Sequence, residues 1–240
     1  MARRPIPALT ADFENVVRYL QERGIMSAAL SPTTLENAKK IHRATHSLIL
    51  WRFRLGRLPE NASVFIEEIA SDALQILPQV FSGYSKTPKL LMRGIIENTL
   101  RHVYFSDHPV EFTRMNIEEK WYVSVEELMD YTKVHPDFRK TEVKFAALDR
   151  LRNLYSELSA GIHGRKVSDL EMRTALEKIV YEEDLAARLT SLVERCVEIS
   201  NFFLTVFQRA RFNDFSVEDR RVILRTLDAR ARSIWREIEQ

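Results

Sequence analysis

The chain has 240 residues, 45% of them hydrophobic and 29% charged, and its formal net charge at pH 7 is +2. This balance is ordinary for a globular protein, and so small a net charge does not by itself indicate a nucleic-acid partner. The single cysteine, Cys196, excludes an internal disulfide, and no run reaches the roughly 18 apolar residues of a membrane span, so we expect a cytoplasmic protein without membrane contact. The chain contains only 6 glycines and 8 prolines, which favours long helices over a turn-rich sheet.

The first half of the chain carries four helical patterns with recognisable ends. Ser31-Pro32 has the form of an N-cap followed by proline at the first helical position, and Gly24 and His108-Pro109 are typical helix stops. Pro78 lies inside the third pattern and should kink or end that helix near the preceding turn. The patterns predict helices over residues 11–23, 32–55, 61–81 and 89–105.

The second half is predicted to begin with an irregular segment over residues 109–123. Ser124 and Glu127 have the spacing of a capping box and open a short helix, which His135-Pro136 breaks. Ser168 and Glu171 repeat the capping-box spacing, and Ser216 has the form of another cap. Further helices are predicted over residues 141–163, 168–181, 182–211 and from 216 to the C-terminus.

The predicted fold is all-α, a multi-helix bundle, because neither strand-like alternation nor an internal repeat stands out. A short polar turn at residues 82–85 suggests an N-terminal helical part, residues 1–84, followed by a helical bundle, residues 85–240. The same turn is equally compatible with a loop inside one domain.

Two rows of polar residues stand out on the predicted helices. Arg93, Glu97 and Arg101 are spaced by four residues and share a helix face, either as ion pairs in solvent or as a polar strip against another helix. The second row lies on the helix that ends at Gly164, where a histidine is also favoured simply as a cation near the negative helix end. Its members step by three, four and four residues along one edge: Arg152, Tyr155, Ser159 and His163.

The second row carries a resemblance to a known superfamily. The pattern Tyr155-x-x-Leu158-Ser159-x-x-x-His163-Gly164, preceded by Arg152-Asn153, resembles the second-half helix of HEPN proteins. The helix with Glu97-Asn98-x-x-Arg101 resembles the partner helix of that superfamily, so the similarity covers about residues 85–210. The resemblance implies a HEPN-like helical bundle of a prokaryotic toxin–antitoxin or antiviral defence system, acting as a homodimer or as a subunit of a larger complex.

The resemblance also implies a site. Catalytic HEPN proteins are metal-independent ribonucleases, in which a histidine moves a proton and an arginine holds the phosphate. Here Arg152, Asn153 and His163 would be catalytic, supported by Arg93, Glu97, Arg101, Tyr155 and Ser159. Ten residues separate Arg152 from His163, which is longer than the superfamily's arginine–histidine spacing. Three alternatives therefore stay open: a ribonuclease, a non-catalytic subunit for binding or assembly, and a purely structural scaffold for protein interactions.

The sequence predicts neither a metal site nor a cofactor. His42 and His46 have the four-residue spacing that can hold zinc on a helix. The glutamate of an HExxH helix is missing, however, and no cysteine or acidic cluster follows nearby in the sequence, so structural or surface histidines are the simpler interpretation.

Arginines mark the C-terminal helix as a candidate interface with RNA, DNA or an acidic partner. No lysine occurs from Arg209 onward, and the planar guanidinium group suits phosphates and carboxylates. The alternative is an ordinary charged surface, because acidic residues interleave with the arginines. The stripe consists of Arg221, Arg225, Arg232 and Arg236, opposite the apolar Ile223, Leu227, Ile234, Trp235 and Ile238.

Overall fold

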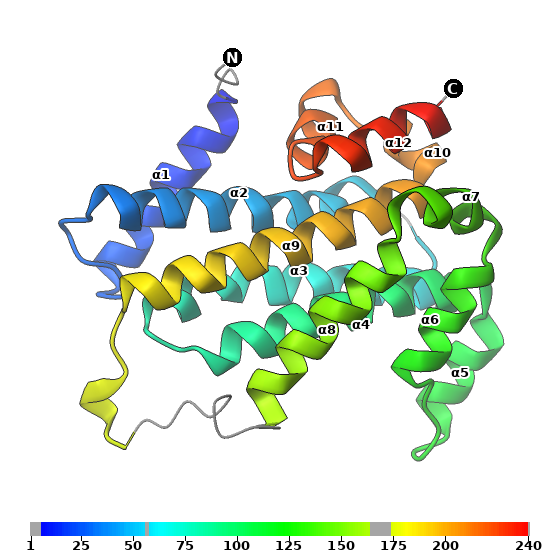
Figure 1. The fold of residues 1–240 in the computed structure, drawn as a ribbon, viewed down its shortest axis with the longest axis horizontal. Coiled ribbons are helices and arrows are strands. Elements are labelled where there is room, and N and C mark those ends of the chain that lie inside the picture. Colours follow the sequence, from blue (N-terminus) through cyan, green and yellow to red (C-terminus); the bar gives the residue numbers. More distant parts are fainter. Residues whose placement is uncertain (1–5, 56–57, 164–173, 240) are drawn as a thin grey trace.

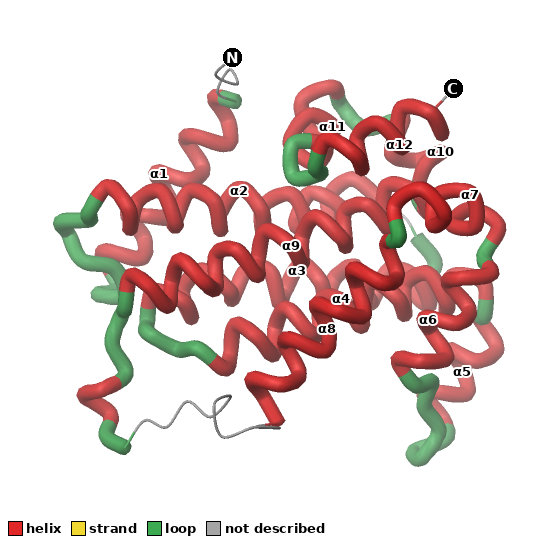
Figure 2. The backbone as a smooth tube through the Cα atoms, in the orientation of Figure 1, coloured by secondary structure: helices red, strands yellow, loops and turns green. Residues whose placement is uncertain are grey.

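The computed structural model describes residues 6–55, 58–163 and 174–239, with the backbone alone at positions 140, 142–145, 161, 163, 176, 238 and 239. Within these ranges the chain is helical with no strand (Figure 2). The predicted all-α fold is thereby confirmed, with 81% of the described residues in helices. No helix in the described ranges combines the length and the apolar character that crossing a membrane requires.

The first four helices begin and end close to the predicted positions. Gly24 lies beyond α1 with φ +69°, and the Ser31 hydroxyl accepts a hydrogen bond from the Thr34 N–H at 3.0 Å, as an N-cap should. Pro78 does not end α3, which continues for three more residues, because a proline in the last turn removes only one backbone hydrogen bond. These helices are α1 (Pro7–Glu22), α2 (Pro32–Leu55), α3 (Glu60–Phe81) and α4 (Lys86–Asp107).

The segment predicted to be irregular contains a helix, α5 (Pro109–Ile117). Pro109 occupies its first position and Glu111 its first turn, which favours a helix start. No residue of α5 is buried, so its sequence lacks the hydrophobic period that would have revealed it. The predicted capping box at Ser124 and Glu127 is confirmed, and it opens α6 (Val125–Val134).

The predicted helix over residues 141–163 is two helices, α7 (Pro136–Phe145) and α8 (Ala147–His163). Ala146 between them has φ +50°, in the left-handed region, which ends α7. The prediction for residues 168–181 is wrong in its described part, since residues 174–181 contain only the 3-10 turn Leu176–Lys178. Gly164, Ser168 and Glu171 lie outside the described residues.

The C-terminal part also differs from the prediction. After α9 (Glu183–Phe207) and α10 (Arg209–Asn213), the single expected helix is divided into α11 (Val217–Leu224) and α12 (Ala229–Glu239). Ser216 caps α11 as predicted, by accepting from the Asp219 N–H at 3.1 Å. Asp228 starts α12, because its carboxylate accepts from the Ala231 N–H at 2.7 Å. Neither glycine nor proline marks this break in the sequence.

Helices α2, α3, α4 and α9 run side by side along the long axis of the molecule, and α8 crosses α4 (Figure 1). α1 packs on α2, whereas α11 and α12 lie over the ends of α2, α7 and α9. One cluster of buried apolar side chains extends from Ile6 to Trp235, and it includes the fully buried Trp51, Phe202 and Phe212. The division at residue 84 stays a prediction.

A buried polar network fixes the C-terminal helices on the bundle. Asn201 of α9 is fully buried and accepts a hydrogen bond from Trp51 Nε1 of α2 at 2.8 Å. Its amide nitrogen donates to the hydroxyls of Ser47 at 2.7 Å and Thr226 at 2.8 Å. Thr226 lies in the turn between α11 and α12, so this network ties the position of that turn to α2 and α9.

Candidate functional site

The predicted polar row on α4 meets α8. Tyr155 of α8 donates from its hydroxyl to Glu97 Oε1 at 2.7 Å, and Arg93 Nε lies 2.9 Å from the same oxygen and 2.9 Å from the Tyr155 hydroxyl. The Arg93 guanidinium also covers the Tyr155 ring, 4.8 Å from its centroid. On the other side of Glu97, Arg101 Nη2 lies 3.6 Å from Oε2. The structure thus brings Arg93, Glu97, Arg101 and Tyr155 together.

Hydrogen bonds and ion pairs connect the four side chains of this cluster. Burial and the hydrogen bond to Glu97 raise the pKa of Tyr155 to about 12, so the hydroxyl stays protonated at pH 7 and acts as a donor. The arginines surround one carboxylate, and all of these side chains are at least partly shielded from water. Such a set holds α4 and α8 in register, as a partnered polar strip between helices can.

The remaining residues of the second row are not part of this cluster. The side chains of Arg152 and Asn153 are exposed, and Arg152 pairs with Asp149 at 3.4 Å on its own helix. Ser159 is 3% exposed, and its hydroxyl has no hydrogen-bond partner among the described residues. The edge that begins at Arg152 therefore runs from solvent into the core. His163 ends α8, and its side chain lies outside the description.

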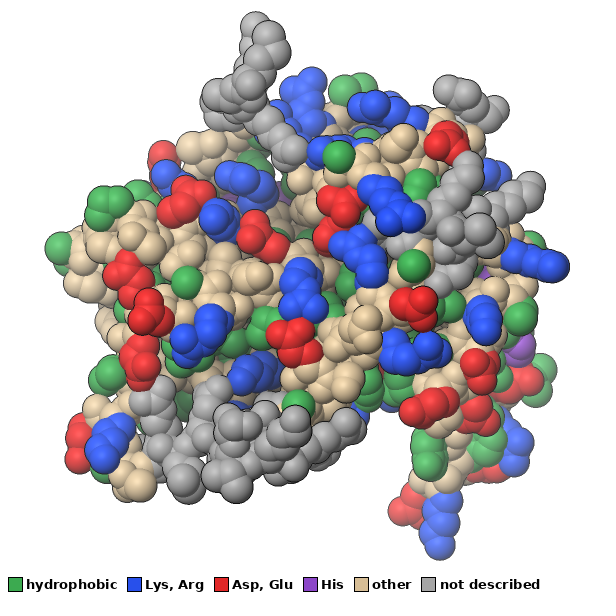
Figure 3. Space-filling model, viewed as in Figure 1, with side chains coloured by type: hydrophobic (Ala, Val, Ile, Leu, Met, Phe, Trp, Pro, Cys, Tyr) green, Lys and Arg blue, Asp and Glu red, His purple; other side chains and the backbone are tan. Residues whose placement is uncertain are grey.

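The arginines of the C-terminal stripe line a pocket. It has a volume of about 620 Å³ and lies between α11 and α12, where basic side chains gather near the top of the view in Figure 3. We call it the arginine pocket. It is lined by Arg220, Arg221, Arg225, Arg232 and Arg236 together with Val217, Leu224 and Trp235.

The break between α11 and α12 creates this pocket. In one continuous helix, the predicted stripe would face outward along a single line. Because the turn at residues 225–228 lets α12 fold back beside α11, arginines of both helices line the same hollow. Arg220 also lines it, although it was not predicted. The only feature of the sequence that points to Arg220 as a lining residue is its position next to Arg221.

Among the described residues, the charged side chains that line the arginine pocket are all arginines, and none is acidic. Two nearby acids are engaged elsewhere: Asp219 binds Arg54 Nε at 2.8 Å, and Asp228 binds Arg150 at 3.5 Å. Within the described ranges, no ion-pair partner is found for Arg221, Arg232 and Arg236. Guanidinium groups keep their charge at any physiological pH, so the pocket is suited to an anion with several charges.

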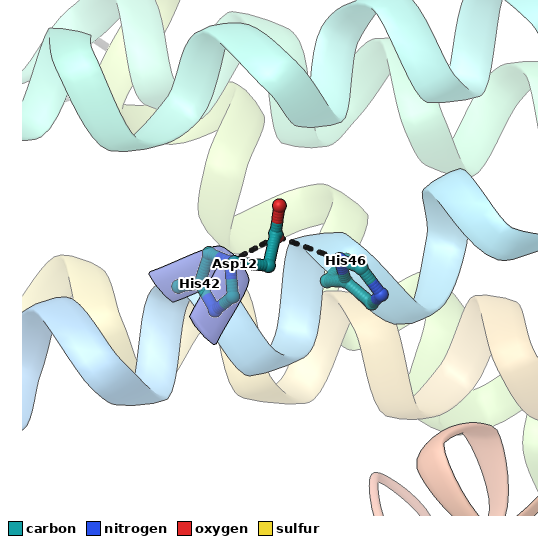
Figure 4. Close-up of side chains that lie close together, drawn as sticks. All are labelled: Asp12, His42 and His46. Carbon is teal, nitrogen blue, oxygen red and sulfur yellow. Dashed lines mark hydrogen bonds and ion pairs between the residues drawn. The ribbon is translucent and has the colours of Figure 1, made fainter. Parts of the chain in front are cut away.

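A third cluster combines residues from α1 and α2 (Figure 4). Asp12 Oδ2 lies 2.8 Å from His42 Nε2 and 3.1 Å from His46 Nδ1. Both histidines have a spacing that can hold zinc, but no third ligand is near them in the sequence. Asp12 was missed because it is 30 residues from His42 and reaches it only when α1 packs on α2. Burial lowers the pKa of His42, which favours its neutral form.

No protein-family model matches the chain, and no significant similarity to curated proteins or to solved structures is found. The HEPN-like resemblance therefore stays a prediction.

Proposed function

We propose that this protein binds a single-stranded nucleic acid, with backbone phosphates of the strand seated in the arginine pocket. The observation that carries the proposal is the convergence of five arginines on one hollow of about 620 Å³. The chain as a whole has a net charge of only +2, so this concentration of positive charge is local. Planar, five-donor guanidinium groups bind phosphates through paired, charge-assisted hydrogen bonds.

The shape of the arginine pocket also supports a strand. A rigid duplex contacts proteins along a broad face, whereas a flexible strand can enter a hollow and expose its bases. Leu224 and Trp235 add apolar surface to the lining, where a sugar or a base can pack beside the phosphates. The volume lies within the range of about 300–1,000 Å³ that is usual for ligand pockets, which is enough for a nucleotide unit.

A second proposal follows the HEPN-like resemblance. In it, the chain is a cytoplasmic subunit of a prokaryotic defence or toxin system. It acts in RNA binding or assembly, as a homodimer or within a complex. Its support is that α4 and α8, which carry the resemblance, pack together through Arg93, Glu97 and Tyr155. In its ribonuclease form, Arg152, Asn153 and His163 would act on the bound RNA. Both proposals are compatible with RNA as the ligand, and only the ribonuclease form of the second adds cleavage.

Fluorescence anisotropy with a labelled 20-nucleotide RNA tests the first proposal. We expect the double variant Arg232→Gln/Arg236→Gln to bind at least about tenfold more weakly, because it loses charged hydrogen bonds to phosphate. The matched control is Arg18→Gln/Arg188→Gln, which removes the same charge from exposed positions on α1 and α9. Equal affinity of the two double variants for the RNA would overturn the proposal.

A further inference from the structure

We propose that Asp12, His42 and His46 form a binding site for a divalent transition-metal ion, zinc by preference. One imidazole nitrogen of each histidine faces the same carboxylate oxygen, and the three potential ligand atoms all lie within 4.8 Å of one another (Figure 4). The histidines are one helical turn apart on α2, and the aspartate comes from α1.

The distances fit zinc after a small movement. Zinc binds histidine nitrogen at about 2.0–2.1 Å and carboxylate oxygen at about 2.0–2.2 Å, so tetrahedral ligand atoms are roughly 3.3–3.5 Å apart. Asp12 Oδ2 is now 2.8 Å from His42 and 3.1 Å from His46. The carboxylate must therefore withdraw by a few tenths of an ångström. The Asp12 side chain is 46% exposed, which leaves it room to do so.

The two histidines are held in place more firmly than the aspartate. His42 is buried and packs edge-to-face on Phe13 of α1, and the two imidazole rings are 5.6 Å apart. α1 itself is anchored by Phe13 and Leu20, both buried. The packing of α1 on α2 therefore preorganises the ligands before any ion arrives, which limits the entropy lost on binding.

The donor set selects the class of ion. Two imidazole nitrogens and one carboxylate suit zinc and its transition-metal neighbours, whereas Mg²⁺ and Ca²⁺ prefer ligand sets made of oxygen alone. Binding requires a lone pair on His42 Nε2 and on His46 Nδ1, with the proton of each neutral ring on its other nitrogen. The same nitrogens already face Asp12, so a change of tautomer directs both lone pairs toward the carboxylate.

Three protein ligands leave one tetrahedral position for another donor. The ligand residues line a pocket of about 330 Å³ whose other residues are mostly apolar, among them Val16, Ile49 and Leu77. Tyr19, Phe53 and Leu74 of this pocket are more than half exposed. A water molecule or a donor atom of a small, largely apolar ligand can therefore occupy the fourth position, as in zinc sites that keep one position open.

A simpler role for the cluster is a pair of hydrogen bonds that fixes α1 on α2. Both roles predict that α1 detaches more easily when Asp12 is replaced. Only the metal site predicts stoichiometric zinc binding, so the experiment has to measure the ion itself.

Isothermal titration of the full chain, first freed of metal with a chelator, tests the proposal with ZnCl₂ and, separately, with MgCl₂. We expect one zinc ion per chain and no heat of specific binding from magnesium. His46→Ala should bind zinc at least about tenfold more weakly, and Asp12→Asn should also weaken zinc binding, because each loses one ligand. The control is His108→Ala, a partly buried histidine at the end of α4 that should leave the affinity unchanged.

Circular dichroism establishes that each variant is folded, and cobalt(II) gives a second readout. We expect cobalt to produce an intense visible band, typical of four-coordinate geometry, in the wild type and not in His46→Ala. At the same zinc concentration, the melting temperature of the wild type should also rise more than that of His46→Ala. Wild-type and His46→Ala chains that take up zinc with the same stoichiometry and affinity would overturn the proposal, as would an equal loss of affinity in His108→Ala.

Discussion

Replacing Asn201 by alanine should destabilise the fold strongly, because the amide joins three parts of the molecule. The variant loses the hydrogen bonds to Trp51 at 2.8 Å, Ser47 at 2.7 Å and Thr226 at 2.8 Å. The two hydroxyls keep partners, since they also donate to backbone carbonyls. Trp51 is fully buried, and no other partner of its N–H is found in the described structure.

The magnitude follows from these partners. An orphaned buried N–H costs about 1–3 kcal/mol, and the hydrogen bonds lost at the hydroxyls add about 1 kcal/mol. The space left by the amide adds about another 1 kcal/mol, so the free energy of unfolding should fall by about 3–5 kcal/mol. Urea unfolding followed by circular dichroism measures the loss.

A double-mutant cycle with Trp51→Phe separates the hydrogen bond from the cavity. In the Trp51→Phe background there is no N–H to orphan, so Asn201→Ala should cost about 1–3 kcal/mol less than in the wild type. Additive effects of the two substitutions, or a loss below about 1 kcal/mol for Asn201→Ala alone, would refute the reasoning.

Three further predictions concern other parts of the chain. Burial and the neighbouring Glu68 raise the pKa of Asp72 from 3.8 to about 7. Between these two values the folded chain keeps a proton on Asp72 that the unfolded chain releases. This group therefore makes the free energy of unfolding fall as the pH rises from about 4 to 7. Asp72→Asn should therefore stabilise the protein by about 1–3 kcal/mol more at pH 8 than at pH 4, and equal shifts in thermal melts at both pH values would contradict this. Gly83→Ala should lower stability by about 2 kcal/mol or more, because φ is +82° and the added Cβ would clash with the Val180 backbone. The control Gly24→Ala, with φ +69° and open space around it, should cost about 1–2 kcal/mol. RNA incubated with excess chelator should remain intact with both the wild type and His163→Ala, because Arg152 and Asn153 are exposed; cleavage by the wild type alone would support the ribonuclease form of the second proposal.

Local chemistry made much of the fold predictable. Three helix starts depend on hydrogen bonds between groups only a few residues apart. They are at Ser31-Pro32, at the capping box of Ser124 and Glu127, and at Ser216. The long apolar period of α9 likewise reflects one buried helix face. Such features can be predicted from the sequence because they depend on residues that are close along the chain.

The features that were missed depend on tertiary structure. The break before α12 rests on the single cap at Asp228, which pairs with Arg150 of a distant helix. The predicted arginine stripe contains four residues of the arginine pocket. The pocket itself forms only because the chain turns back at the break between α11 and α12. Asp12 meets His42 and His46 only through the packing of α1 on α2, so no spacing rule could have joined them.

The most direct test of the binding proposal is the salt dependence of RNA affinity. Each phosphate neutralised on a single strand contributes about −0.7 to the slope of log K against log salt concentration. If Arg232 and Arg236 each contact one phosphate, their double glutamine variant should reduce the magnitude of that slope by about 1.4, while Arg18→Gln/Arg188→Gln leaves it unchanged. A slope identical to that of the wild type in the Arg232→Gln/Arg236→Gln variant would show that the arginine pocket does not hold the strand.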